Sequence, residues 1–232
     1  MEPLHPHVYW HVLGFTFDGT ILMYSWATMA VVFLLGLWAV RQANPGRPTP
    51  LQNAFELLLE TMGGFVREQI HPKQRHLLLS VVASLFTYLL VANLVGLIPG
   101  QTSPTADLNV TMGMAIGVFF LVQISGLYVK GIRGYIDHVK GPIKAPLTWL
   151  FFAPLTIVEE LSKPLTLAFR LFGNIFAGEI LLGLLVAIPV WLGGFIPAVA
   201  WMAFSIFVGF IQAFIFTVLT LAYVGIMTSE DH

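Results

Sequence analysis

The sequence predicts an all-α polytopic membrane protein with five transmembrane helices, one cytoplasmic-side amphipathic helix and a long, tilted carboxy-terminal helical hairpin. Of its 232 residues, 57% are hydrophobic and only 10% are charged, whereas a soluble domain carries about 25% charged residues. Several runs approach the roughly 20 apolar residues that cross a bilayer. They are continuous, not short and alternating as in a transmembrane β-barrel. We therefore expect a single membrane domain embedded in a lipid bilayer.

The segments follow from local composition, in chain order. A Pro/Gly break ends the first apolar span, and the next segment is too polar to cross a membrane. Its apolar residues recur at helical spacing, which predicts an amphipathic interfacial helix. The predicted ranges are 1–20 for an outer amino-terminal segment, 21–41 for the first span, 50–71 for the amphipathic helix, 77–98 and 108–129 for the second and third spans, 147–188 for a long tilted helix and 198–228 for the last helix.

Lysine and arginine fall almost entirely on one side of this topology. The segments on the other side, 1–20, 99–107 and 189–197, contain neither residue. Because cytoplasmic loops are enriched in both, the amino terminus is predicted to lie outside and the carboxyl terminus in the cytoplasm. The basic residues on the predicted cytoplasmic side are Arg41, Arg47, Arg67, Lys73, Arg75, Lys130, Arg133, Lys140 and Lys144.

The long helix carries charge in a very apolar stretch, RLFGNIFAGEI, which begins at Arg170. At about 100° per residue, Glu159, Lys163 and Asn174 fall within about 40° of Arg170 and share its stripe. Glu179 falls on the opposite side of the helix. With a rise of about 1.5 Å per residue, Glu159 is expected about 16 Å toward the cytoplasm from Arg170, and Glu179 about 13 Å toward the outside.

The last helix returns antiparallel and adds two polar residues. Counted from the turn, Gln212 matches the depth of Arg170, and Ser205 matches that of Glu179. Arginine cannot lose its proton, and its insertion at the bilayer centre costs about 2.5–3.5 kcal/mol. A structural ion pair of Arg170 with Glu179 or Glu159 is one explanation, although the helical wheel separates the first pair and axial distance the second. The pattern favours an arginine that awaits a carboxylate on another protein, within an ion path.

These residues are similar to those of a known family. RLFGNIFAGEI, with IVEELSKPLTLAF before it and IQAFIFTVLTLAYV in the last helix, closely resembles subunit a of F-type ATP synthases. VANLVGLIPGQTSPTADLNVT resembles the second span and outer loop of that family. The resemblance is close over residues 88–227 and looser before them. It implies a non-catalytic stator subunit with two aqueous half-channels, which couples proton flow to ATP synthesis.

The resemblance also implies roles for particular residues. Arg170 would face the carboxylate of the rotating c-ring, and Asn174 and Gln212 would help to hold that interface. Glu179 would belong to the half-channel open to the outside. Some relatives carry a histidine at the position of Ser205, so a serine there leaves Glu179 and water as the proton carriers. The other implied positions are Asp107 and Asn109 near the mouth of the outer half-channel, and Glu159 near the cytoplasmic half-channel.

The implied partners are the c-ring along the Arg170 stripe, the peripheral-stalk b subunits along the first span and amphipathic helix, and the rest of the F-type ATP synthase in a bacterial cell membrane. No basic cluster suggests nucleic acid. We expect no cofactor and no metal, and the absence of cysteine rules out disulfides, iron–sulfur ligation and thiol catalysis. The His5, His7 and His11 cluster is better explained by a solvated terminus than by a metal site.

Several alternatives stay open at this stage. Asp107 follows a Pro-rich turn and precedes a helix, so it could cap that helix as well as line a channel. A sodium-coupled synthase would share the same pattern. A secondary transporter is less favoured, because the paired inverted segments of that class are missing. An intramembrane hydrolase would need a Ser/His pair, an acidic dyad or HExxH on the spans, and the sequence supplies none of these.

Overall fold

The computed structural model describes residues 9–12, 15–44, 46, 48–98, 101–140, 149–189 and 194–229. Within these ranges the chain is built from six α-helices, two 3₁₀ turns and one β-hairpin. Five of the helices are long and apolar enough to cross a membrane, which confirms the predicted all-α polytopic fold. Some positions named above lie outside the described residues. They are Arg47, Lys144 and residues 1–8, which include His5 and His7, together with residues 13–14, 99–100, 147–148 and 190–193.

The first described elements are a β-hairpin and a helix that the rest of the chain covers only slightly. Strands β1 (Tyr9–Val12) and β2 (Phe15–Asp18) pair antiparallel. Asp18 then caps helix α1 (Gly19–Arg41), because its carboxylate accepts the Thr20 N–H at 3.0 Å. Little of α1 is buried by the rest of the chain, which suits a helix surrounded by lipid or by another subunit. Its exposed large side chains include Trp26, Phe33 and Trp38.

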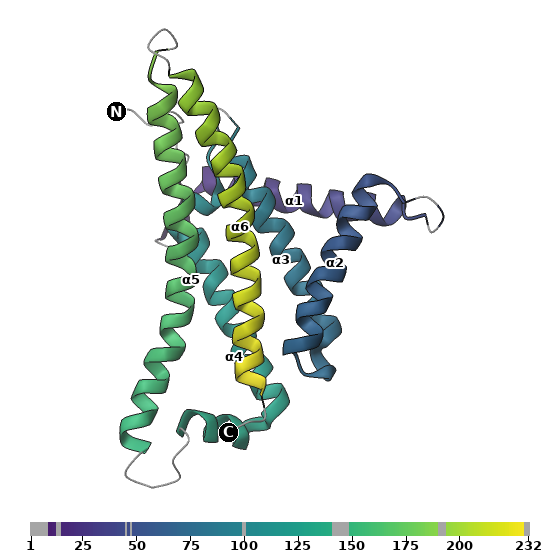
Figure 1. Cartoon of the computed structure of the whole chain (residues 1–232). Coiled ribbons are helices and arrows are strands. Elements are labelled where there is room, and N and C mark those ends of the chain that lie inside the picture. The colour runs from purple at the N-terminus through teal and green to yellow at the C-terminus, as the bar shows by residue number, and fades with distance from the viewer. Residues whose placement is uncertain are drawn as a thin grey trace.

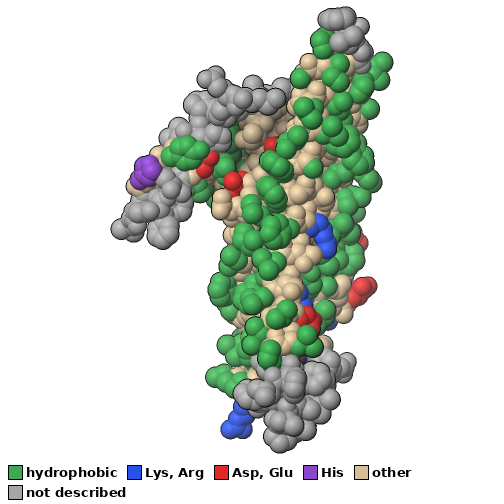
Figure 2. Space-filling model, turned by 90° about the vertical axis from the view of Figure 1, so that its left-hand side faces the viewer, with side chains coloured by type: hydrophobic (Ala, Val, Ile, Leu, Met, Phe, Trp, Pro, Cys, Tyr) green, Lys and Arg blue, Asp and Glu red, His purple; other side chains and the backbone are tan. Residues whose placement is uncertain are grey.

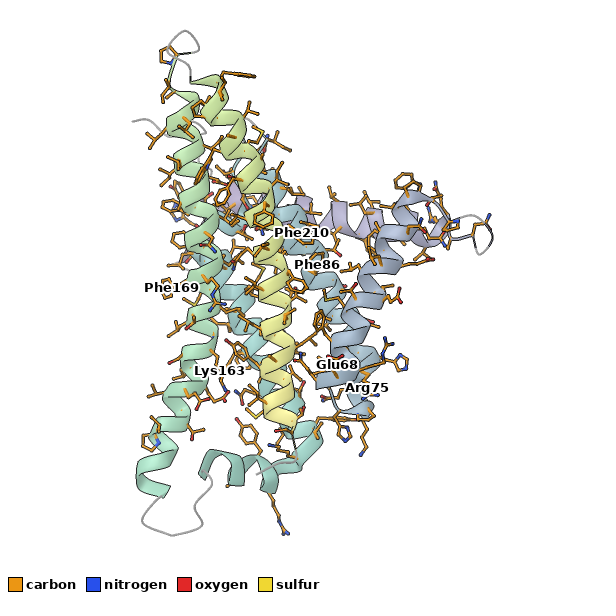
Figure 3. All side chains as sticks on the ribbon, viewed as in Figure 1. Glu68, Arg75, Phe86, Lys163, Phe169 and Phe210 are labelled. Atoms are coloured by element: carbon orange, nitrogen blue, oxygen red, sulfur yellow. The ribbon has the colours of Figure 1, made fainter. Side chains whose placement is uncertain are left out.

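Helix α2 (Pro50–Gln69) begins at a Thr49 cap with proline in its first turn, a favourable start for a helix. Its buried Met62 and Val66 belong to the common core. The 3₁₀ turn η1 (Pro72–Gln74) leads into helix α3 (Arg75–Val95). Helix α3 packs on the last helix, where Phe86 and Phe210 meet edge to face with ring centroids 5.8 Å apart (Figure 3).

Helix α4 (Leu108–Lys140) follows the 3₁₀ turn η2 (Pro104–Ala106) and is longer than the predicted span 108–129. The charged, glycine-containing segment after Val129 was expected to be a loop. It is instead a second helical segment, separated from the first by a break at Gly131. Gly131 has φ 68° and ψ 176°, and glycine adopts a positive φ without the steric penalty of a Cβ. The chain therefore turns at Gly131 and resumes helical hydrogen bonding.

Helices α5 (Trp149–Val186) and α6 (Phe195–Thr228) form the carboxy-terminal hairpin, with α1 lying across its long direction (Figure 1). The 38 residues of α5 extend about 57 Å, nearly twice the ~30 Å hydrocarbon core of a bilayer. The hairpin must therefore be strongly tilted if it stays within the membrane. Separations along α5 are consequently larger than separations in depth, so the 16 Å and 13 Å expected for Glu159 and Glu179 overstate their depth differences.

Candidate functional site

The Arg170 side chain is partly exposed on the α5 stripe that it shares with Lys163, Thr166 and Asn174. Its neighbours on this stripe, Thr166 and Asn174, are exposed, while Leu167 and Leu171 point into the core. Figure 2 shows the side of the molecule on which α5 lies in Figure 1, and the described part of this side is covered mainly by hydrophobic side chains, with only scattered charged ones. Among the described residues, no carboxylate lies within 4.0 Å of the Arg170 guanidinium. The structure therefore presents a permanent cation on an apolar face, with no counter-charge supplied by the part of the chain that the structure describes.

Asn174 and Gln212 lie together, one helical turn from Arg170. The Asn174 Nδ2 donates to Gln212 Oε1 at 2.9 Å, joining α5 to α6. Gln212 is only 2% exposed, and its Nε2 has no hydrogen-bond partner among the residues that the structure describes. A buried donor without a partner is unfavourable by about 1–3 kcal/mol. The amide is therefore poised to donate to a water or to an acceptor supplied by another chain.

Glu179 lines a cavity on the other side of α5, nearer the hairpin turn. The cavity measures about 40 Å³, enough for roughly three water molecules at about 10–15 Å³ each. Glu179 Oε1 accepts the Ser103 N–H at 2.7 Å. Ser205 Oγ is buried at the same cavity, and no described residue forms a hydrogen bond with it. The polar side chains that line the cavity are Asn93, Asn174, Glu179, Trp201 and Ser205.

The cavity brings together residues that the sequence placed on two faces of α5. Asn174 belongs to the Arg170 stripe, and Glu179 lies on the opposite face, yet both line this cavity. It therefore reaches from Glu179 to the Asn174–Gln212 pair. Water in this space could carry a proton between these levels, because the cavity is large enough to hold water and several polar side chains line its otherwise apolar wall.

Asp107 and Asn109 lie at the start of α4, outside the lining of the Glu179 cavity. Asp107 Oδ1 accepts the N–H groups of Asn109 at 2.8 Å and Val110 at 3.2 Å, which makes Asp107 the cap of α4. Asn109 is exposed. Neither side chain lines the Glu179 cavity. Of the two roles left open for Asp107, the structure contains the cap.

Near the other end of α5, the structure contains an ionic cluster that sequence reasoning described only in part. Lys163 Nζ lies 2.5 Å from Glu160 Oε1 and 3.4 Å from Glu159 Oε1. The Glu160 side chain is 13% exposed and that of Glu159 is 66% exposed. Figure 3 shows Lys163 on the side of α5 that faces α6, where its Nζ lies 5.9 Å from the Tyr223 ring centroid. The closer partner of Lys163 is therefore Glu160, and Glu159 is its second, more distant partner.

Glu160 also connects α5 to α4. The Gln123 Nε2 donates to Glu160 Oε2 at 3.0 Å, and the Tyr135 hydroxyl donates to Gln123 Oε1 at 2.7 Å. The helical wheel contained a signal for this. Glu160 falls about 80° from Arg170, between the buried Leu167 and Leu171, so it belongs to the inward face. No sequence pattern of this kind identifies Gln123 on α4 as the partner of Glu160, or Tyr135 as the donor to Gln123.

We compared the sequence with those of known protein families and of individual proteins. The sequence model of the family described as ATP synthase A chain matches residues 22–225. The chain is 41% identical over 227 residues to the ATP synthase subunit a of Desulforamulus reducens, covering 96% of this chain and 84% of that protein. It is 36% identical to the ATP synthase subunit a of Lysinibacillus sphaericus and 34% identical to that of Bacillus subtilis, each over 95% of this chain and 96% of the relative.

Proposed function

Because the chain belongs to the ATP synthase subunit a family, the ion-translocating membrane subunit of F-type ATP synthase, we propose that it translocates protons and carries the arginine that faces the rotating c-ring. It is a multi-pass membrane protein and a component of the complex, not its catalytic subunit. The observation that carries the proposal is Arg170, a permanent cation on an apolar stripe of α5 without a carboxylate partner among the described residues.

Arg170 attracts an ionised ring carboxylate and prevents protons from passing directly between two half-channels. A charged side chain within a membrane faces a protein interior, water or a counter-charge. The ring supplies that counter-charge each time an ionised carboxylate arrives. Once protonated, the carboxylate is neutral and can move into lipid at low energetic cost. The Asn174–Gln212 pair holds the two helices beside this contact.

The outer half-channel passes through the Glu179 cavity. A proton from outside reaches Glu179 and then the ring carboxylate through water beside Asn174 and Ser205. Asp107 and Asn109 lie toward the mouth of this path, where Asp107 also caps α4. Ser205 carries no ionisable group, so the proton moves between Glu179 and water there. Each proton that crosses releases about 2.3 kcal/mol per 100 mV of membrane potential, and several are needed for one ATP.

The inner half-channel opens near Glu159. The Glu159 carboxylate is exposed on the Arg170 stripe and is only loosely paired with Lys163. Glu160 binds Lys163 more closely, which leaves the charge of Glu159 less compensated. A ring carboxylate that reaches this level loses its proton toward the cytoplasm. It then returns ionised to Arg170.

The charge asymmetry supports an orientation with the amino terminus outside and the carboxyl terminus in the cytoplasm. The peripheral-stalk b subunits would then contact α1 and α2. Both helices have faces that the described chain does not cover, and α1 carries several exposed large apolar side chains. The c-ring would lie against the exposed stripe of α5.

The proposal is tested on the intact complex, extracted in mild detergent and reconstituted in sodium-free vesicles. We expect copurifying c and b subunits, together with ATP synthesis driven by an imposed pH gradient and membrane potential. A requirement for added sodium ions would identify a sodium-coupled synthase. A lone chain that transports a solute without the other subunits would make it a secondary transporter and would contradict the proposal.

Replacement of Glu160 by leucine is expected to lower the thermal stability of this chain within the complex more than the same change at Glu159. The first change leaves the partly buried Lys163 without its nearer carboxylate and the Gln123 amide without its acceptor. Loss of one partner of such a pair costs about 3–5 kcal/mol when fully buried, and the remaining Glu159 reduces this to about 1–2 kcal/mol. The measurement is the temperature at which heated, detergent-solubilised complex loses this chain.

A double replacement, Glu160→Leu with Lys163→Met, is the control for the ion pair. Removal of both charges often restores stability, because no charge is left buried alone. The double variant should therefore release the chain at a higher temperature than Glu160→Leu. Equal temperatures for Glu159→Leu and Glu160→Leu would contradict the assignment of Glu160 as the principal partner of Lys163.

A further inference from the structure

We propose that the segment between α3 and α4 positions the carboxyl group of Glu179, and that the Ser103 N–H determines which of its two oxygens takes up a proton. This inference rests on the proposed role of Glu179 in the outer half-channel. It adds Ser103 and Gly96 to the path as positioning residues, although neither can carry a proton from water to the ring.

The contact joins two parts of the chain that are 76 residues apart. The Ser103 N–H donates to Glu179 Oε1 at 2.7 Å, and the described residues form no other hydrogen bond with this carboxyl group. A short bond from a backbone N–H to a carboxylate is among the stronger hydrogen bonds in proteins. It therefore fixes the end of a side chain that would otherwise rotate about three bonds.

The donor itself is held by a buried network. The Ser103 hydroxyl donates to the Ala92 carbonyl at 2.7 Å, and the Thr105 hydroxyl donates to Asn93 Oδ1 at 2.7 Å. Asn93 Nδ2 in turn donates to the Gly209 carbonyl at 2.9 Å. The side chains of this network are at most 3% exposed. The segment is thus tied to α3 and α6, so the Ser103 N–H keeps its direction.

Gly96 provides the space for this arrangement. A Cβ at Gly96 would overlap Glu179 Oε1 and would lie 2.8 Å from the Ser103 Cβ. The backbone of Gly96, with φ −65° and ψ −11°, is open to any residue. Glycine is therefore required here for close approach and not for its conformation. A side chain at this position would push the carboxyl group off the Ser103 N–H.

The hydrogen bond has a chemical consequence. An oxygen that accepts an N–H serves as the carbonyl-like oxygen of the neutral acid, so the acidic proton of Glu179 resides on Oε2. Oε2 then takes a proton from cavity water and passes it on, with no change in the Oε1 contact. A carboxyl group without this contact would take up protons on either oxygen and in several orientations. A smaller fraction of these carboxyl orientations would be aligned with the water path.

Two substitutions at Ser103 separate the N–H from the hydroxyl. Ser103→Pro removes the N–H, and the Ser103 φ of −67° matches that of proline. Ser103→Ala removes the hydroxyl but keeps the N–H, and is the matched control. The measurement is passive proton flux from the outer side, driven by a potassium diffusion potential, in vesicles containing the membrane sector. The amount of copurified c subunit reports assembly.

We expect Ser103→Pro to lower the flux about tenfold relative to Ser103→Ala, as loss of a charge-assisted hydrogen bond implies. In a Glu179→Gln background, which has no carboxyl proton to place, the same change should alter the flux less than about twofold. A merely structural role would lower flux or assembly in both backgrounds. Equal flux for the proline and alanine variants would overturn the inference, whereas wild-type flux in Glu179→Gln alone would overturn the proposed function.

Gly96→Ala gives an independent result from the other side of the contact. It should reduce the flux about as much as Ser103→Pro, because it displaces Glu179 Oε1. Gly113→Ala is the control, since a Cβ at Gly113 meets nothing within 4 Å. If Gly96→Ala prevents assembly, the Ser103 pair still decides the question. A Gly96→Ala complex that assembles with wild-type flux would contradict the positioning role.

Discussion

Arg170→Ala is expected to abolish ATP synthesis while the complex still assembles. The variant removes the α5 cation that has no carboxylate partner among the described residues, unlike Lys163. This charge is the one proposed to attract an ionised ring carboxylate and to keep protons from passing between the half-channels. Removal of one partner of a buried ion pair costs about 3–5 kcal/mol, and loss of the contact between Arg170 and a ring carboxylate therefore corresponds to more than about 100-fold in rate. The measurement is ATP synthesis by reconstituted vesicles under an imposed proton gradient, with ATP-driven proton pumping as a second assay.

Two further variants separate charge from shape at this position. Arg170→Lys keeps a positive charge but lacks the planar fork that binds a carboxylate through two hydrogen bonds, so synthesis should be reduced but measurable. Thr166→Ala changes an exposed neighbour on the same stripe, whose hydroxyl donates only to its own helix at the Ser162 carbonyl. It should keep wild-type rates. Normal synthesis by Arg170→Ala would refute the assignment of this residue.

The Arg170 stripe could be predicted because it is a property of one helix. A fixed rotation of about 100° per residue places Asn174 beside Arg170 and Glu179 opposite, whatever the rest of the chain does. Antiparallel counting from the turn then placed Gln212 near this level, and the Asn174–Gln212 hydrogen bond lies there. Helical periodicity and antiparallel register are local rules, and together they were sufficient to predict that Asn174 and Gln212 lie close together near the level of Arg170.

The hydrogen-bond donors to the Glu179 and Glu160 carboxyl groups could not be predicted in the same way. The Ser103 donor is a backbone N–H, which every residue except proline has, so the sequence contains no mark of it. Gln123 meets Glu160 only because α4 and α5 pack at one particular register. The turn at Gly131 was also missed, because glycine and charged residues suit a loop as well as a broken helix. These features depend on tertiary packing.

Glu179→Gln is expected to slow proton uptake from the outside by about 100-fold, the lower end of the range for loss of a positioned acid–base group. Glutamine fills the same space and can still accept the Ser103 N–H, so the cavity and the packing of α5 should be retained. Only the ability to bind and release a proton is removed. The measurement is flux through the membrane sector, with the outside as proton source, over a range of driving potentials.

Charge loss as such is controlled by Glu60→Gln, because Glu60 is an exposed carboxylate on α2, away from the cavity. This variant should conduct as the wild type does. Ser205→Ala makes a complementary test: it removes a buried hydroxyl from the cavity but no ionisable group, so its effect should be smaller than that of Glu179→Gln. If Glu179→Gln and Glu60→Gln conducted equally, Glu179 would have no part in the path. Water in the cavity would then have to deliver protons to the ring unaided.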